Sequence, residues 1–121
     1  MRPPHKLSDN QIILVSFQQD VQQKLRPGLV LRMFPKYNDL LICGISAQLH
    51  QYLSGFDLIL DPTDPDFPAT GLKKAGVCRI NMLMMLPLHY VTGSIGSVSP
   101  IVHQTLFRTF VPWEIKLQMG S

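Results

Sequence analysis

The residues best suited to chemistry in this chain are an arginine and a short polar triplet, each at one end of an apolar segment. Arg26 lies on a Pro-Gly turn and leads directly into an apolar run, and the triplet Ser46-Ala47-Gln48 ends the next such run. A guanidinium stays charged at any working pH and donates hydrogen bonds in a planar fork that suits phosphate oxygens. If the two runs are neighbouring strands, Arg26, Ser46 and Gln48 can bracket a phosphate group.

A second arginine, Arg79, lies inside an apolar segment and alternates there with Asn81. Alternate residues of a strand project to one face, so we expect the two side chains to lie together. Two interpretations stay open for them: substrate binding, and an internal ion pair between Arg79 and an aspartate. For Arg26 the alternative is an ordinary surface cation before a turn, and for Ser46 it is ordinary turn chemistry.

Charge is distributed unevenly along the chain, although the net charge is only +3. Residues 1–36 carry six Lys and Arg against two Asp, and residues 73–116 carry five against one Glu. Residues 39–66 carry five aspartates and no cation. This pattern fits a solvated acidic loop between two mildly basic regions, or a cationic face for a polyanion with the acidic loop turned away from it.

The composition is that of one folded domain. The chain has 121 residues, of which 45% are hydrophobic and 16% are charged, so it can bury a core and is not disordered. So few charges on a small, surface-rich domain predict a homodimer. No apolar run is long enough to cross a bilayer, and none follows the basic residues at the N-terminus, so we expect no signal peptide. We expect a single cytoplasmic domain over residues 1–121, with flexible ends at 1–9 and 118–121 and no membrane partner.

Cysteine and histidine residues give no sign of a metal site. Cys43 and Cys78 are single residues in apolar segments, where we expect buried structural thiols. The four histidines are scattered, without the paired spacing of metal ligands. We therefore expect no metal and no cofactor.

Short aliphatic segments separated by Gly, Pro and Asp predict a sheet of strands with one helix late in the chain. The predicted strands cover residues 11–17, 28–33, 40–46, 56–60, 77–86, 91–98 and 113–117. Strand 77–86 is apolar enough to be buried on both faces. The helix is expected to begin at Ser99, a good N-cap, and to end before Pro112. Its residues that share a face are Ile101, Val102, Thr105, Leu106 and Phe110. The fold class is mainly β, a small and strongly bent antiparallel barrel with a C-terminal helix.

Five blocks of the sequence, in order, resemble the PemK/MazF-like toxins of bacterial type II toxin–antitoxin systems. They are IILVSF at 12–17, KLRPGLVL at 24–31, LICGISAQ at 41–48, TGLKKAGVCRI at 70–80 and IGSVS at 95–99. The resemblance implies an SH3-like barrel, a homodimer and a sequence-specific endoribonuclease that cleaves single-stranded RNA without a metal. It also implies a cognate antitoxin as partner, and contact with DNA only through the toxin–antitoxin complex.

The same resemblance assigns roles to individual residues. Arg26 takes the place of the family's catalytic arginine, and Ser46 stands where a catalytic threonine is usual. Arg79 stands where some members place an arginine at the active site, and Gln48 and Asn81 are further substrate-binding candidates. Attack by the 2′-hydroxyl on the neighbouring phosphate would leave a cyclic phosphate and a 5′-hydroxyl. Independently of the resemblance, His50 is the candidate for proton transfer because it lies just beyond Gln48. For stacking of the bases, the candidates are Phe17, Phe34 and Tyr37.

The chain departs from the family pattern at four places. Ser46 replaces threonine, Ala47 replaces a frequent serine, and Asn81 replaces an aspartate that some members use. Asp9-Asn10-Gln11 stands where a Gly-Asp pair is usual. Two alternatives to the endoribonuclease follow: a family member that binds RNA or antitoxin without cleaving, and a gyrase-poisoning toxin with the same barrel.

Overall fold

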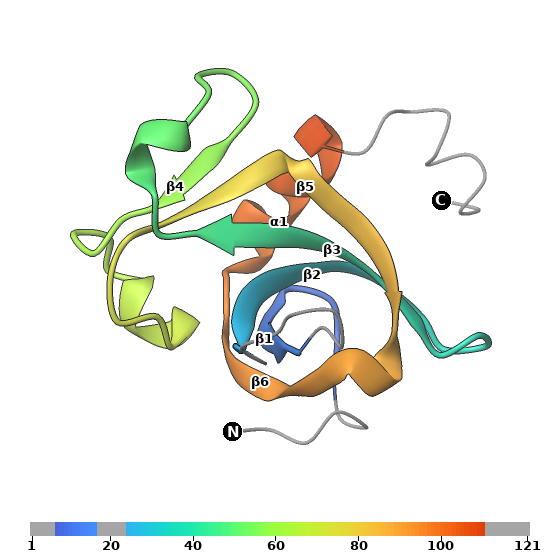
Figure 1. Cartoon of the computed structure of the whole chain (residues 1–121). Helices are drawn as coiled ribbons and strands as arrows, with labels where there is room; N and C mark the ends of the chain where they lie inside the picture. Colours follow the sequence, from blue (N-terminus) through green and yellow to red (C-terminus); the bar gives the residue numbers. More distant parts are fainter. Residues whose placement is uncertain (1–6, 17–23, 111–121) are drawn as a thin grey trace.

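The computed structural model describes residues 7–16 and 24–110, without the side chains of 80, 81, 109 and 110. Six antiparallel strands form one sheet in the order β4-β5-β3-β2-β1-β6. The strands are β1 (Gln11–Val15), β2 (Arg26–Phe34), β3 (Asp39–Ser46), β4 (Leu58–Leu60), β5 (Gly76–Pro87) and β6 (Val91–Ser97). Strands β2, β3 and β5 curve over β1, and β6 passes along its other side, which gives the sheet the bent shape of a small barrel (Figure 1). The predicted fold class is confirmed, and the predicted strand at 113–117 lies outside the described residues.

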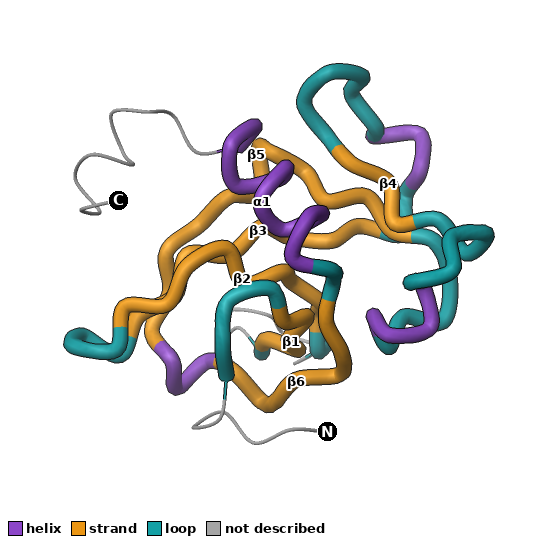
Figure 2. The backbone as a smooth tube through the Cα atoms, turned by 180° about the vertical axis from the view of Figure 1, so that it is seen from behind, coloured by secondary structure: helices purple, strands orange, loops and turns teal. Residues whose placement is uncertain are grey.

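Alternation along the strands produces two apolar clusters, one on each face of the sheet. In β2, Leu29 and Leu31 belong to one cluster and Val30 belongs to the other. In β3, Leu41 and Cys43 likewise belong to the first cluster, and Leu40 and Ile42 belong to the second. Because successive side chains of a strand point to opposite faces, apolar residues at consecutive positions require that both faces be covered. The sheet curls over the cluster that contains Val30, and helix α1 (Pro100–Phe110) lies over the other (Figure 2).

Helix α1 begins as the sequence predicts. The Ser99 hydroxyl accepts a hydrogen bond from the Val102 N–H at 3.2 Å, and Pro100 is the first helical residue. The buried face, however, differs from the prediction. Leu106 is buried and Val102 half-buried, but Ile101 is 76% exposed and Thr105 is exposed too.

The face of α1 is instead completed by His103 and Phe107. The His103 ring nitrogen Nε2 lies 2.9 Å from the Leu31 carbonyl oxygen of β2, and Phe107 packs against the core. A polar side chain that finds a backbone partner on the sheet sets the rotation of the helix. The apolar pattern alone could not indicate this choice.

Strand β5 is the other place where the structure corrects the sequence analysis. The strand is buried at its start, at Val77 and Cys78, and again at Leu86, but Met85 is 52% exposed. The prediction that the strand is buried on both faces is therefore wrong at Met85 in the single chain. No helix in the part of the chain that the structure describes is long and apolar enough to span a bilayer.

Candidate functional site

The hairpin of β2 and β3 brings the two predicted catalytic residues to one end of the sheet. Gly28 of β2 pairs with Gly44 of β3 in an antiparallel ladder. Two residues further along each strand, this register places Arg26 across from Ser46. The turn that joins the strands lies at the opposite end, so the start of β2 and the end of β3 are held together by the ladder between them. The sequence prediction that these segments are neighbouring strands is correct.

Arg26 and Ser46 line a groove of about 420 Å³, together with Gln48. We call it the cationic groove; its lining residues are Lys24, Leu25, Arg26, Pro27, Ile45, Ser46, Ala47, Gln48, Leu72, Lys73, Lys74, Ala75, Gly76 and Met82. Four of these side chains are cations, and none is a carboxylate or an imidazole. Cations that line one concave surface concentrate a positive potential there, which favours a polyanion such as a nucleic-acid backbone.

The Ser46 hydroxyl is held by two hydrogen bonds. It donates to the Gln51 Oε1 at 2.8 Å and accepts from the Gln48 N–H at 3.0 Å. Serine lacks the methyl group that restricts a threonine side chain. Here the two hydrogen bonds restrict the Ser46 rotamer instead, so the hydroxyl has a defined orientation without the methyl group.

Arg79 lies behind the groove, not in its lining. Its Nη1 donates to the same Gln51 Oε1 at 3.1 Å and lies 3.8 Å from the Met82 sulfur. Its Nε is buried without a hydrogen-bond partner among the described residues. Within that part of the chain the partner of Arg79 is thus a glutamine, and the alternative of an ion pair with an aspartate finds no support. The Asn81 side chain lies outside the described residues.

A bulge in β5 gives Arg79 this position. Cys43 of β3 pairs with Leu83, whereas Ile45 pairs with Cys78. Four residues of β5, 79–82, therefore face the single residue Gly44. A Cβ on Gly44 would lie 2.6 Å from the Met82 Cε and 2.9 Å from its Cβ, so only glycine leaves room for the bulge. Bulges next to functional sites commonly redirect a side chain in this way.

The two cysteines are buried thiols, as predicted. The Cys43 Sγ donates to the Arg79 carbonyl oxygen at 3.1 Å, which holds the backbone at the start of the bulge. The hydrogen bond between the Cys78 and Cys43 thiols, in which Cys78 donates, is the larger cause that raises the pKa of Cys78 well above its ordinary value of 9.0, and the burial of the thiol raises it further. Both thiols therefore have a structural role in supporting the strand that carries Arg79.

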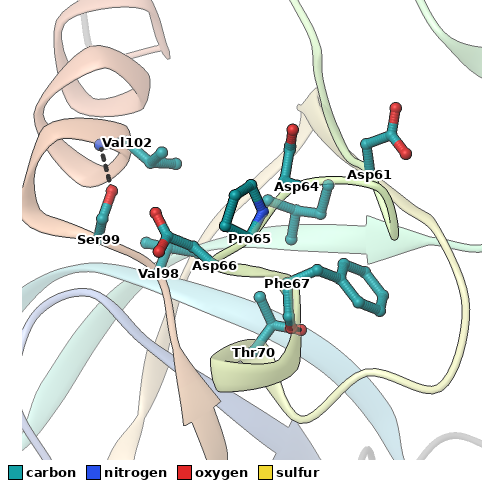
Figure 3. Close-up of a pocket in the computed structure, with 10 residues that line it drawn as sticks. Asp61, Asp64, Pro65, Asp66, Phe67, Thr70, Val98, Ser99 and Val102 are labelled. Atoms are coloured by element: carbon teal, nitrogen blue, oxygen red, sulfur yellow. Dashed lines mark hydrogen bonds between the residues drawn. The ribbon is translucent and has the colours of Figure 1, made fainter.

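A second hollow, of about 220 Å³, has the opposite charge (Figure 3). It lies between the start of α1 and the loop that contains Asp61, Asp64 and Asp66. Its lining contains no cation, just as the lining of the cationic groove contains no carboxylate. Hydrogen bonds from the Thr63 N–H and hydroxyl lower the pKa of the Asp61 carboxyl. The acidic loop thus lines a hollow separate from the cationic groove, an arrangement that both charge interpretations allow.

The predicted stacking residues are not at the groove. Phe34 and Tyr37 lie at the far end of the β2–β3 hairpin, eight or more residues from Arg26 and so roughly 25 Å away along the strand. This part of the prediction is wrong, because closeness in sequence is not closeness in an extended hairpin. Phe17 lies outside the described residues. Gln51 is not among the predicted site residues, although it contacts both Ser46 and Arg79.

His50 is exposed on the short 3₁₀ turn η2 (Leu49–Gln51) and is not part of the groove lining. In the described ranges, no three His, Cys, Asp or Glu side chains gather as metal ligands. The chemistry available in the groove is therefore that of cations, a hydroxyl and amides.

Solved structures with a similar fold include two from mycobacteria. The Mycobacterium tuberculosis toxin MazF-mt6 superposes with a TM-score of 0.62 and 16% identity, over 83% of this chain and 91% of that one. An endoribonuclease in complex with its cognate antitoxin, from a mycobacterial species, superposes with a TM-score of 0.61 and 12% identity. That match covers 92% of this chain and 96% of the other. No protein-family model and no curated protein matches the sequence. The chain therefore has the MazF/PemK-like toxin fold that the sequence motifs predict.

Proposed function

We propose that the protein is an endoribonuclease toxin of a toxin–antitoxin module, which cleaves single-stranded RNA in the cationic groove. The observation that supports this most directly is the meeting of Arg26 and Ser46 in a groove whose charged residues are all cations. The fold shared with MazF-mt6 and with an endoribonuclease points to the same activity.

In this proposal Arg26 stabilises the negative charge that develops on the phosphate. A guanidinium is a poor base, and its fixed fork of donors matches the oxygens of a five-coordinate phosphorus. Loss of one well-placed donor to a developing oxyanion commonly lowers kcat by about 10²–10³. Lys24, Lys73 and Lys74 hold the flanking phosphates, which positions the RNA without reading its sequence.

The reaction that fits the groove is attack by a ribose 2′-hydroxyl on the adjacent phosphorus. The bond from phosphorus to the 5′-oxygen breaks, so the products are a 2′,3′-cyclic phosphate and a 5′-hydroxyl. The proton of the 2′-hydroxyl leaves and a proton reaches the 5′-oxygen, and no water is consumed. Because the described lining lacks carboxylate and imidazole groups, we propose electrostatic stabilisation as the main source of rate.

Tyr52 and Phe56 are our candidates for stacking on bases next to the cleaved phosphate. Both side chains are exposed, at 39% and 56%, in the segment that follows the groove residue Gln48. Single-stranded RNA is commonly bound through bases that stack on exposed aromatic rings. Leu49 and Leu53 in the same segment are also exposed and extend the apolar surface.

The proposed partners are single-stranded RNA, a second copy of the chain and a cognate antitoxin, in the cytoplasm. One structural neighbour is an endoribonuclease in complex with its cognate antitoxin. An antitoxin segment with acidic side chains would suit the cationic groove and would compete there with RNA.

A second candidate function is RNA or antitoxin binding without cleavage. It is favoured by the hydrogen bonds of Ser46, whose only proton is donated to Gln51 and so is not available to a phosphate oxygen. It is also favoured by Asn81, an amide that cannot transfer a proton as the aspartate of some family members can.

The test is incubation of the purified protein with naked RNA, in the absence of gyrase and with EDTA present. We expect cleavage at a short recurring sequence, with 5′-hydroxyl and cyclic phosphate ends identified by sequencing and by phosphatase and kinase treatment. Intact RNA that still binds, with an affinity that falls as salt rises, would favour the second candidate. Intact RNA without binding would contradict both candidate functions. Inhibition of gyrase in a separate supercoiling assay would then indicate the gyrase-poisoning alternative.

A further inference from the structure

Gln51 contacts both Ser46, which lines the cationic groove, and Arg79, which is not part of the lining. Its Oε1 accepts from the Ser46 hydroxyl at 2.8 Å and from the Arg79 Nη1 at 3.1 Å. Arginine can only donate, so the atom that faces Arg79 must be the carbonyl oxygen of the amide. The Ser46 hydroxyl must then be the donor to that oxygen, and its proton has a defined direction.

The backbone between Ser46 and Gln51 is built to hold this contact. The Gln48 N–H donates to the Ser46 Oγ at 3.0 Å, and the Gln51 N–H donates to the Gln48 carbonyl oxygen at 3.0 Å. These two turns fold the chain back so that the Gln51 side chain returns to the end of β3. The contact between Ser46 and Gln51 is thus local, whereas the contact with Arg79 comes from strand β5.

We infer that Gln51 is a positioning residue, which presents the Ser46 oxygen to RNA as a hydrogen-bond acceptor and holds Arg79 behind it. A hydroxyl oxygen has one proton and two lone pairs. In Ser46 the proton is given to Gln51 and one lone pair accepts from Gln48. The lone pair that remains can accept from a ribose 2′-hydroxyl but has nothing to donate to a phosphate oxygen.

This inference rests on the proposed function and changes the role of Ser46 within it. Ser46 would orient the attacking 2′-hydroxyl, and stabilisation of the phosphate would fall to Arg26 and the groove lysines. Without the Gln51 oxygen, the Ser46 proton is free to turn toward a phosphate oxygen. RNA would still bind, but its nucleophile would be held less well.

The experiment compares cleavage kinetics of Gln51→Met, Gln51→Glu and the wild type. Methionine keeps the length of the side chain and removes the acceptor, and it is tolerated because Gln51 is only half-buried on a surface turn. We expect Gln51→Met to lower kcat by about 10- to 100-fold with KM unchanged. Glutamate keeps an oxygen that can accept both hydrogen bonds, so kcat should return toward the wild-type value. Its negative charge repels RNA, so KM should rise, and the rise should be largest at low salt.

Gln104→Met, at an exposed position of α1, is the matched control and should behave as the wild type. A wild-type kcat for Gln51→Met, or a change in KM alone, would overturn the inference. So would a low kcat for Gln51→Glu, because that variant keeps the acceptor.

If the wild type does not cleave RNA, the proposed function fails, and the link between Gln51 and Ser46 is measured without it. Urea unfolding midpoints of Ser46→Ala, Gln51→Met and the double variant form a cycle. We expect the two single shifts to sum to more than the shift of the double variant. Additive shifts would show that the two side chains are not coupled, whatever the protein does to RNA.

Discussion

Replacement of Gly44 by alanine tests the bulge that carries Arg79. Alanine can adopt the backbone conformation at this position, because φ of Gly44 is not positive. The obstacle is Met82, whose Cε and Cβ would lie 2.6 and 2.9 Å from the new methyl group. The Cε is the end of a flexible side chain, but the Cβ is fixed to the backbone, so the bulge itself must move.

The expected cost follows from these contacts. Overpacking of a well-packed site costs about 1–3 kcal/mol, and the smaller backbone entropy of unfolded alanine returns about 0.4–1 kcal/mol. The difference between these two ranges is a net loss of about 0–2.6 kcal/mol, and the backbone-fixed Met82 Cβ favours the middle of that range, about 1–2 kcal/mol. The melting temperature should then fall by about 4–8 °C for a chain of this size. Because Met82 touches the Arg79 Nη1, RNA cleavage should fall as well.

Thermal melting followed by circular dichroism measures the effect, with Gly28→Ala as the control on the neighbouring strand. There the nearest atom is the Ile42 Cδ1 at 3.1 Å, a side-chain end that can turn away, so the control should be neutral or slightly stabilised. Met82→Ala should relieve part of the loss in Gly44→Ala. Equal melting temperatures for Gly44→Ala and Gly28→Ala would refute the packing argument.

Three further predictions concern charge, thiols and stacking. Lys73→Ala should weaken RNA binding and reduce the slope of log affinity against log salt by about 0.7, as measured by fluorescence anisotropy over a salt series. Cys43 and Cys78 should resist a thiol reagent at pH 8 until the protein unfolds, and rapid labelling of the native protein would contradict their burial. Because folding raises the pKa of Cys78, the free energy of unfolding should decline as the pH rises above 9.0. Tyr52→Ala and Phe56→Ala should weaken RNA binding with the salt slope unchanged, and wild-type affinity for both would exclude this surface as the stacking site.

The strands and the start of the helix could be predicted from sequence because their signals are local. Period-2 and continuous apolar runs, glycine and proline punctuation, and Ser99 as N-cap each act within a few residues. The pairing of Arg26 with Ser46 was predictable as well, since two adjacent strands joined by a short turn form a hairpin.

The features that could not be predicted depend on contacts between distant segments. The rotation of α1 is set by His103 against Leu31 of β2, and the bulge of β5 is set by the space over Gly44. The role of Gln51 requires that Arg79, 28 residues away, return to the same point. Phe34 and Tyr37 are only 8 and 11 residues from Arg26 in the sequence, but the extended strand β2 places them at the far end of the hairpin.

The most direct test of the account is the cleavage rate of Arg26→Ala measured beside Arg108→Ala. Both substitutions remove an exposed arginine, but only Arg26 lines the cationic groove, whereas Arg108 lies in the last turn of α1. We predict that Arg26→Ala lowers kcat on naked RNA by about 10²–10³ while the protein stays folded by circular dichroism, and that Arg108→Ala cleaves as the wild type does. Cleavage by Arg26→Ala at the wild-type rate would contradict the central claim that this groove is the active site.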